Sequence, residues 1–148
     1  MTEDEEEYED HEVLKKKFEN FVKKAEEGDL LSMRLLARIY TESEYFPRDT
    51  FAAEAWLRKA AELGDDKAKF QLAKMLSNGN GVAKNLEESF CLYQELMFDC
   101  DVDAMMEVGI ALKEGKGVPK NEELGSKYID YAWDIELDLM KDDKKESA

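Results

Sequence analysis

A repeat of 36 residues runs through most of this chain and constrains its fold more than any other feature. The stretch AKFQLAKMLSNGNGVAKN, which begins at Ala68, aligns without gaps on AMMEVGIALKEGKGVPKN, which begins at Ala104. The same offset backwards gives SMRLLARIYTESEYFPRD from Ser32, where the glycines are absent but the turn register is kept. Further back, KKAEEGD precedes RKAAELGD by the same offset, which suggests a lone second helix before three full repeats. Such a period indicates stacked units that bury their apolar faces against each other.

Each repeat predicts a pair of antiparallel helices. In the middle repeat, Ala68, Leu72, Ala73 and Leu76 follow the i, i+4, i+5, i+8 pattern of one helical face. The Gly-x-Gly-Val segment that follows gives the backbone freedom to leave this first helix and turn. The first helices therefore pack through one apolar stripe and lead into a short turn.

The residue after each turn and the large side chains of the second helices extend this prediction. Asp49, Asn85 and Asn121 are each suited to cap the helix that follows. Trp56 and Trp133 fall in columns that core residues occupy in the other repeats. We therefore expect both indoles to be buried and not to stack on a ligand.

Composition supports an all-helical class and excludes one class of partner. Good helix formers dominate the composition. Two prolines and eight glycines are too few turn-forming residues for the many tight turns of an all-β protein. The net charge of −15 argues against nucleic acid as a partner, because binding to phosphate backbones draws on clustered Lys and Arg. The sequence thus predicts an all-α protein that does not bind nucleic acid.

The repeat follows the pattern A-x3-LG-x2-Y-x2-G-x-GV-x2-D-x3-A-x2-WY-x-KAAE-x-G, and over roughly residues 12 to 135 it resembles the Sel-1-like repeat. The third repeat keeps Gly109 and the GKGV turn at 115–118, and the first keeps the second-helix signature around Trp56. The resemblance implies an all-α, right-handed α/α superhelical solenoid of three Sel-1-like repeats plus an N-terminal half-repeat helix, related to tetratricopeptide arrays. It also implies the role of an adaptor or scaffold that binds other proteins.

The sequence does not predict catalysis, a metal or a cofactor. Two cysteines, Cys91 and Cys100, and a single histidine, His11, cannot form a zinc set of the usual kind. Some secreted relatives in the cysteine-rich branch of the resembled family have been linked to β-lactam binding or hydrolysis, with a cysteine in each KAA column. That column here holds Ala61, Met97 and Trp133. This departure removes the basis for carrying that activity over. A small hydrolase of that kind stays an alternative hypothesis to a non-enzymatic adaptor, and a self-assembling structural protein is another.

A partner-binding surface can be predicted by analogy with tetratricopeptide arrays, in which first helices line the concave face. Three of its cations, Arg34, Arg38 and Lys74, suit the carboxylates of an acidic peptide, and apolar neighbours suit apolar side chains. The alternative is that these cations offset neighbouring acids or cover apolar surface with their stems. The predicted partner-binding residues are Arg34, Arg38, Phe70, Lys74, Met106, Ile110 and Lys113.

Charge and hydropathy divide the chain into three regions. Residues 1–12 are predicted to be a disordered acidic tail, residues 13–138 the repeat domain, and residues 139–148 a polar C-terminal tail. There is no apolar run of transmembrane length, and the N-terminus is acidic where a secretory leader would be basic and then apolar. We expect a cytoplasmic protein without membrane contact, present as a monomer or weak dimer.

Overall fold

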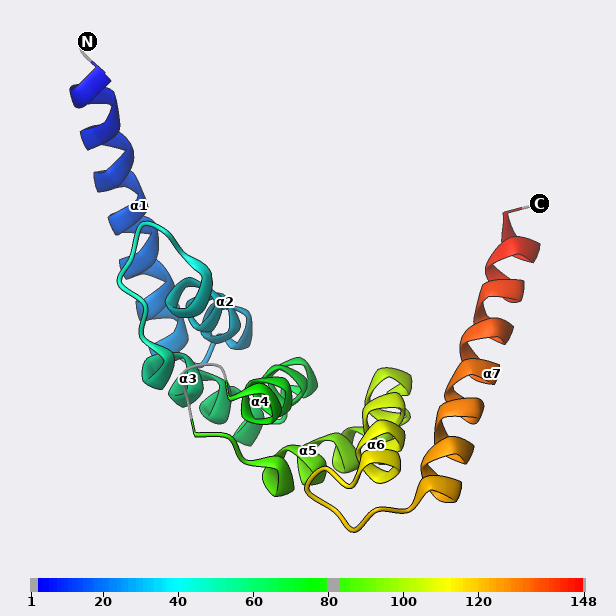
Figure 1. Ribbon diagram of the computed structural model, residues 1–148. Coiled ribbons are helices and arrows are strands. Elements are labelled where there is room, and N and C mark those ends of the chain that lie inside the picture. The colour runs from blue at the N-terminus through cyan, green and yellow to red at the C-terminus, as the bar shows by residue number, and fades with distance from the viewer. Residues whose placement is uncertain (1–2, 80–82, 148) are drawn as a thin grey trace. The chain divides into compact units, whose positions relative to one another are not determined.

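The computed structural model describes residues 3–79 and 83–147, with side chains from residue 10 onward, and these residues form helices and connections without any strand (Figure 1). Within the described residues, no helix is both long and apolar enough to cross a membrane. The helices are α1 (Glu3–Glu26), α2 (Leu30–Glu42), α3 (Thr50–Glu62), α4 (Asp66–Asn78), α5 (Leu86–Phe98), α6 (Val102–Glu114) and α7 (Glu122–Glu146). The predicted all-α solenoid fold, with its half-repeat helix before three helical pairs, is confirmed.

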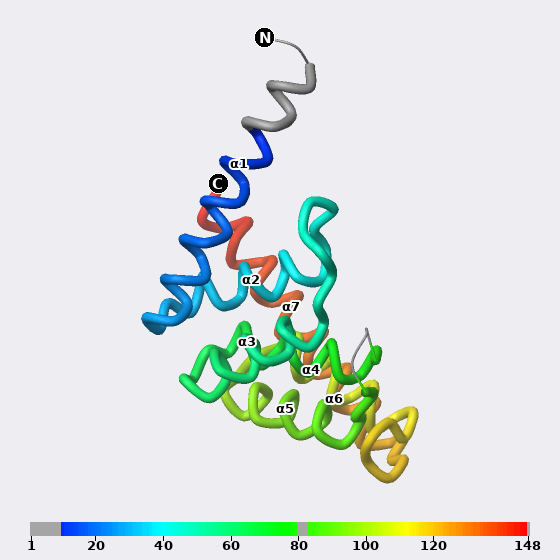
Figure 2. Tube along the Cα trace, turned by 90° about the vertical axis from the view of Figure 1, so that its left-hand side faces the viewer, coloured from blue at the N-terminus to red at the C-terminus, as the bar shows by residue number. Residues whose placement is uncertain are grey.

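The chain forms two compact units, residues 1–68 and residues 69–148. In the first unit, α2 and α3 are antiparallel partners, and their buried residues include Met33, Leu36 and Leu57. The connection between these helices stands out as a cyan loop (Figure 2). Its Phe46 stacks on Phe18 of α1 with ring centroids 4.7 Å apart, so an aromatic contact attaches the half-repeat helix to the first full repeat.

The second unit buries side chains from α4, α5 and α6 in one cluster. Its fully or nearly buried members are Ala73, Tyr93, Leu96, Met97, Ala104, Val108 and Leu112. The buried hydroxyl Oγ of Ser89 donates a 2.7 Å hydrogen bond to the carbonyl oxygen of Ala73, which joins α5 to α4. This bond satisfies a polar group that would otherwise destabilise the core.

The same backbone hydrogen bond closes all three helical pairs at the predicted offset. The backbone N–H of the residue before each second helix donates to a carbonyl oxygen near the end of the first helix, nine residues earlier. These bonds join Asp49 to Tyr40 at 3.0 Å, Asn85 to Leu76 at 3.0 Å, and Asn121 to Leu112 at 2.8 Å. The side chains of Asp49, Asn85 and Asn121 also cap α3, α5 and α7, as predicted.

A second repeated turn reverses the chain between one helical pair and the next. Gly28, Gly64 and Cys100 occupy it with φ of 99°, 89° and 68°. After each of them, the next residue's N–H bonds to a carbonyl five positions earlier, which is the arrangement of a Schellman helix end. Cys100 therefore holds a left-handed conformation that its two counterparts fill with glycine.

Replacing Cys100 by glycine is expected to stabilise the protein by about 0.5–1 kcal/mol. The substitution removes the steric cost of a Cβ in the left-handed region, which is about 1–2 kcal/mol. Glycine also gives the unfolded chain more conformational entropy, and this offsets part of the gain. Chemical denaturation followed by circular dichroism measures this change. Cys91→Gly is the control, because Cys91 lies inside α5, where glycine weakens the helix. A destabilising Cys100→Gly would contradict the role assigned to this turn.

Both termini of the described chain are helical where the sequence predicted tails. The predicted disordered tail covers residues 1–12, yet α1 begins at Glu3, and α7 continues to Glu146 through the predicted polar tail at 139–148. Lys23 and Lys24 in the last turn of α1 are favourable for the helix dipole. Glutamate is a good helix former, so a highly charged segment can still be helical. Residues 1, 2 and 148 lie outside the described part.

Candidate partner-binding site

Arg34, a predicted partner-binding residue on α2, is engaged within the first unit. Its Nε lies 2.8 Å from Oδ2 of Asp65, and the two side chains are 20% and 11% exposed. Both atoms are buried, and among the described residues neither has a partner with hydrogen-bond geometry, so the contact is an ion pair. Arg34 therefore neutralises a neighbouring acid, Asp65, which is the alternative to partner binding for this residue.

Arg38, one turn further along α2, is in a different situation. Its Nε lies 3.4 Å from Oε2 of Glu42 on the same helix, and both side chains are nearly two-thirds exposed. An exposed pair at this spacing contributes about 0.3–0.5 kcal/mol. A partner carboxylate can therefore replace Glu42 at small cost.

The other five predicted residues lie in the second unit. Phe70 packs edge-on against Tyr93 with ring centroids 5.3 Å apart, and it belongs mostly to the core. Lys74 and Lys113 are exposed, and neither forms an ion pair within the part of the chain that the structure describes. The two remaining predicted residues, Met106 and Ile110, are half-buried on α6.

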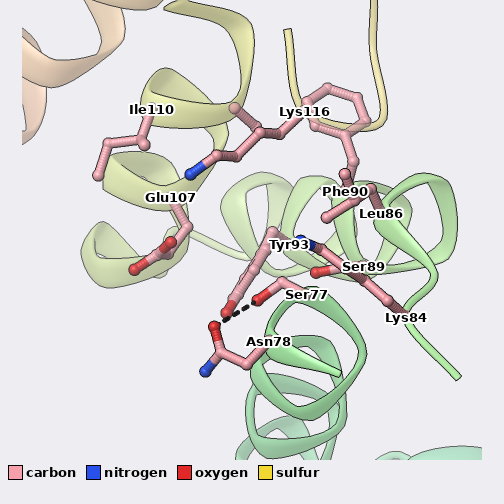
Figure 3. A pocket seen from close by; sticks show the side chains of 11 residues that line it. Ser77, Asn78, Lys84, Leu86, Ser89, Phe90, Tyr93, Glu107, Ile110 and Lys116 are labelled. Atoms are coloured by element: carbon pink, nitrogen blue, oxygen red, sulfur yellow. Dashed lines mark hydrogen bonds between the residues drawn. The ribbon is translucent and has the colours of Figure 1, made fainter. Parts of the chain in front are cut away.

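A pocket of about 340 Å³ lies between α4, α5 and α6 in this unit (Figure 3). Ile110 is the one predicted residue among those that line it. Figure 3 shows Lys84 reaching toward the middle of the pocket and Lys116 lying across it, with its amino group toward Ile110 and Glu107. The lining residues are Ser77, Asn78, Lys84, Leu86, Ser89, Phe90, Tyr93, Glu107, Ile110, Ala111 and Lys116.

Sequence reasoning missed the two lysines of this pocket. Lys84 and Lys116 stand in or beside the glycine turns, for which the sequence predicts only a structural role. Their columns in the repeat differ, so the period gives no signal that they face a common space. Lys116 Nζ lies 2.6 Å from Oε2 of the exposed Glu114, whereas Lys84 has no ion pair among the described residues.

The floor of the pocket carries a buried hydroxyl that stays protonated. Burial raises the pKa of Tyr93, the carboxylate of Glu107 raises it further, and a hydrogen bond with Ser77 acts in the opposite direction. The Tyr93 side chain is almost fully buried. The floor is therefore neutral at physiological pH, and the charges of the pocket are those of the two lysines and Glu107.

The prediction that Trp133 is buried is wrong, since its side chain is 55% exposed on α7. Met97 holds the same column one repeat earlier and is buried in the cluster that includes α6. Equivalent positions in two repeats are buried alike only if a helix follows each of them. Within the described residues no helix follows α7. Trp56 is half-buried, with Nζ of Lys59 5.3 Å from its ring centroid.

The described residues hold no group of three His, Cys, Asp or Glu side chains placed to bind a metal ion. Cys91 and Cys100 are free thiols, and both are exposed.

Solved structures with the same fold support this arrangement. A Sel1 repeat protein from Oxalobacter formigenes superimposes with a TM-score of 0.70 at 24% identity, over 77% of this chain and 87% of the other. A protective antigen of uropathogenic Escherichia coli strains that displays an SLR fold gives 0.73 at 26% identity, over 79% of this chain. This chain spans 25% of the length of that antigen.

The cysteine-rich protein B of Helicobacter pylori is also similar, with a TM-score of 0.58 at 25% identity over 82% of this chain and 87% of the other. Among curated proteins, no sequence matches this chain. The Sel1 repeat model matches residues 30–65, 66–95 and 102–129, which together make up more than half of the chain. The chain therefore belongs to the Sel1 repeat family.

Proposed function

We propose that this chain is a protein-binding module and that the pocket of the second unit receives an acidic, partly apolar segment of its partner. Sel1 repeats generally mediate protein–protein interaction, which supports the general part of this proposal. The specific part rests on one observation: two lysine amines, from Lys84 and Lys116, stand over a pocket that also exposes the apolar side chain of Ile110.

The chemistry of the pocket supports an acidic segment. Leu86 and Phe90 add apolar wall to that of Ile110, which suits an aliphatic or aromatic side chain. The two amines can each donate charge-assisted hydrogen bonds to a carboxylate, and such bonds are stronger than neutral ones. Glu107 is the one acid in the lining, and it can accept a hydrogen bond from an N–H or hydroxyl of the same segment.

The exposed surface of the first helices extends this proposal beyond the pocket. Lys74 on α4 and Lys113 on α6 are exposed, and Met106 is half-buried on α6. Methionine adapts its shape to different side chains, which suits a surface that receives a segment of variable sequence. We include these residues of the second unit as contacts of the same segment, and Arg38 on α2 stays a separate predicted contact of the first unit.

Charge reversal in the pocket tests the proposal. The full chain is used to capture its partner from the native cell extract, and the purified partner is then titrated by calorimetry. Lys84→Glu/Lys116→Glu is expected to weaken binding at least about tenfold, because a net bond to a charged group contributes about 1.5–3 kcal/mol. Arg38→Glu/Lys74→Glu tests the first helices separately and is expected to have a smaller effect.

The control is Lys144→Glu/Lys145→Glu, which makes the same change in net charge at the exposed end of α7. This variant is expected to bind the partner with nearly unchanged affinity. Equal weakening by the pocket and control pairs would mean that only overall charge matters. Unchanged affinity of the pocket pair, with the helical spectrum intact, would place the interface elsewhere.

A further inference from the structure

The C-terminal half of α7 carries an apolar stripe that the described residues leave uncovered. Trp133, Leu137 and Met140 are spaced by four and three residues, so they lie on one side of the helix. Their exposed fractions are 55%, 50% and 54%. Clustered apolar side chains of this size at a surface mark an interaction site more often than isolated ones do. We refer to these three residues as the α7 stripe.

The preceding repeat shows what covers the equivalent surface. Met97 precedes Trp133 by one repeat, is 8% exposed, and belongs to the same buried cluster as Ala104, Val108 and Leu112 of α6. Those three residues of α6 are spaced by four positions each, which makes one apolar helical face. The surface at this column of the repeat is therefore suited to receive an amphipathic helix.

The described residues do not supply such a helix beside α7. After α5, the left-handed turn at Cys100 returns the chain as α6, which then covers Met97. After Trp133, α7 continues without a turn to Glu146, and it extends past the end of α6 (Figure 1). The described part of α7 therefore cannot fold back over its own stripe.

The acidic residues around the α7 stripe favour a helix with a basic polar face. From Asp130 to Glu146, α7 has seven acidic and three basic residues, and the chain has a net charge of −15. A second copy would bring the same acidic surface, so its approach is opposed by repulsion. A basic helix is attracted at long range and can pair with Asp130, Asp134 and Glu136 beside the stripe.

We propose that the α7 stripe docks a basic amphipathic helix of a partner protein, which covers Trp133 as α6 covers Met97 and continues over Leu137 and Met140. This surface lies on α7, which contributes no residue to the pocket. The two proposals are therefore independent, and reversal of Lys84 and Lys116 leaves this contact intact.

A defined peptide probe tests the docking of a basic helix. The probe is an amphipathic peptide of about 18 residues, made of lysine, alanine and leucine with the apolar residues at helical spacing. The protein is the full chain with Trp56→Phe, so that its fluorescence reports Trp133 alone. Binding is expected to shift the emission to shorter wavelength, because the indole leaves water.

Two double variants on α7 separate the stripe from general attraction. Leu137→Ser/Met140→Ser is expected to weaken peptide binding at least about tenfold, as loss of central apolar contacts does. Tyr131→Ser/Leu139→Ser is the control, because these residues are 59% and 53% exposed on other sides of the same helix. The control is expected to change the affinity less than about twofold.

Each other outcome overturns the proposal. Equal weakening by both double variants would show unspecific attraction between a basic peptide and an acidic protein. Equal binding of a matched peptide with glutamate in place of lysine would remove the charge preference. Self-association in sedimentation that Leu137→Ser/Met140→Ser abolishes would identify a second copy as the occupant.

Discussion

Substituting Gly117 by alanine is expected to destabilise the second unit by on the order of 2–5 kcal/mol. A Cβ at this position would lie 2.1 Å from the carbonyl oxygen of Leu86 and 2.8 Å from the backbone nitrogen of Glu87. These are backbone atoms in the first turn of α5, so the contact cannot be relieved by a side-chain rotation. The left-handed φ of +72° adds about 1–2 kcal/mol, and the overpacking adds about 1–3 kcal/mol.

Gly115→Ala is a matched control for this prediction. Gly115 has the same φ of +72°, but its Cβ would lie 3.2 Å from the Cβ of Lys120 and 3.6 Å from the backbone of that residue, which is far less close than the contacts at Gly117. Its expected destabilisation is therefore about 1–2 kcal/mol, the conformational part alone. Chemical denaturation monitored by circular dichroism gives both free energies of unfolding. Equal losses for the two variants would refute the close approach between the turn and α5.

Replacing Gly125 by leucine is expected to destabilise the same unit by about 3 kcal/mol or more. Gly125 is buried where α7 crosses α6, and a Cβ there would lie 2.6 Å from the carbonyl oxygen of Gly109 and 2.7 Å from the backbone nitrogen of Lys113. Leucine improves helix propensity by up to about 1 kcal/mol, which is smaller than the cost of separating two helices. Overpacking therefore determines the sign.

Lys127→Leu is the control for this substitution. It introduces the same side chain two residues away on α7, where the side chain of Lys127 is 70% exposed and pairs with Glu123. The loss of that exposed pair costs about 0.3–0.5 kcal/mol. The denaturation midpoints of the two variants are compared. A Gly125→Leu protein as stable as Lys127→Leu would mean that the backbones of α6 and α7 are not in close contact.

Helices, caps and turns could be predicted from the sequence because each depends on residues close together in the chain. The capping residue Asn85, for example, bonds a backbone amide three positions later. The 36-residue period then repeats such local signals at fixed positions, so that Asp49 and Asn121 support the same conclusion.

The pocket and the true environment of the predicted site could not be predicted in this way. Lys84 and Lys116 come together through the packing of three helices, and no periodic column relates them. Arg34 and Asp65 are far apart in the sequence, and only tertiary packing brings them together as an ion pair. The repeat pattern predicts a buried Trp133 because the equivalent residue of the preceding repeat, Met97, is covered by the next helix. No described helix follows α7, so Trp133 stays exposed.

The amide-to-carbonyl bond that closes each helical pair has a consequence for variation among repeats. The first pair makes this bond across TESEYFPR, and the third makes it across KEGKGVPK, at 3.0 Å and 2.8 Å. Since the bond joins backbone atoms on either side of the connection, it does not depend on the side chains between them, and the exposed positions of a connection can vary while the helices keep their spacing. Gly117 is different, because its contact with the backbone of α5 leaves no room for a side chain. New surface chemistry can therefore arise in these connections at every position except those where the turn itself packs against a helix.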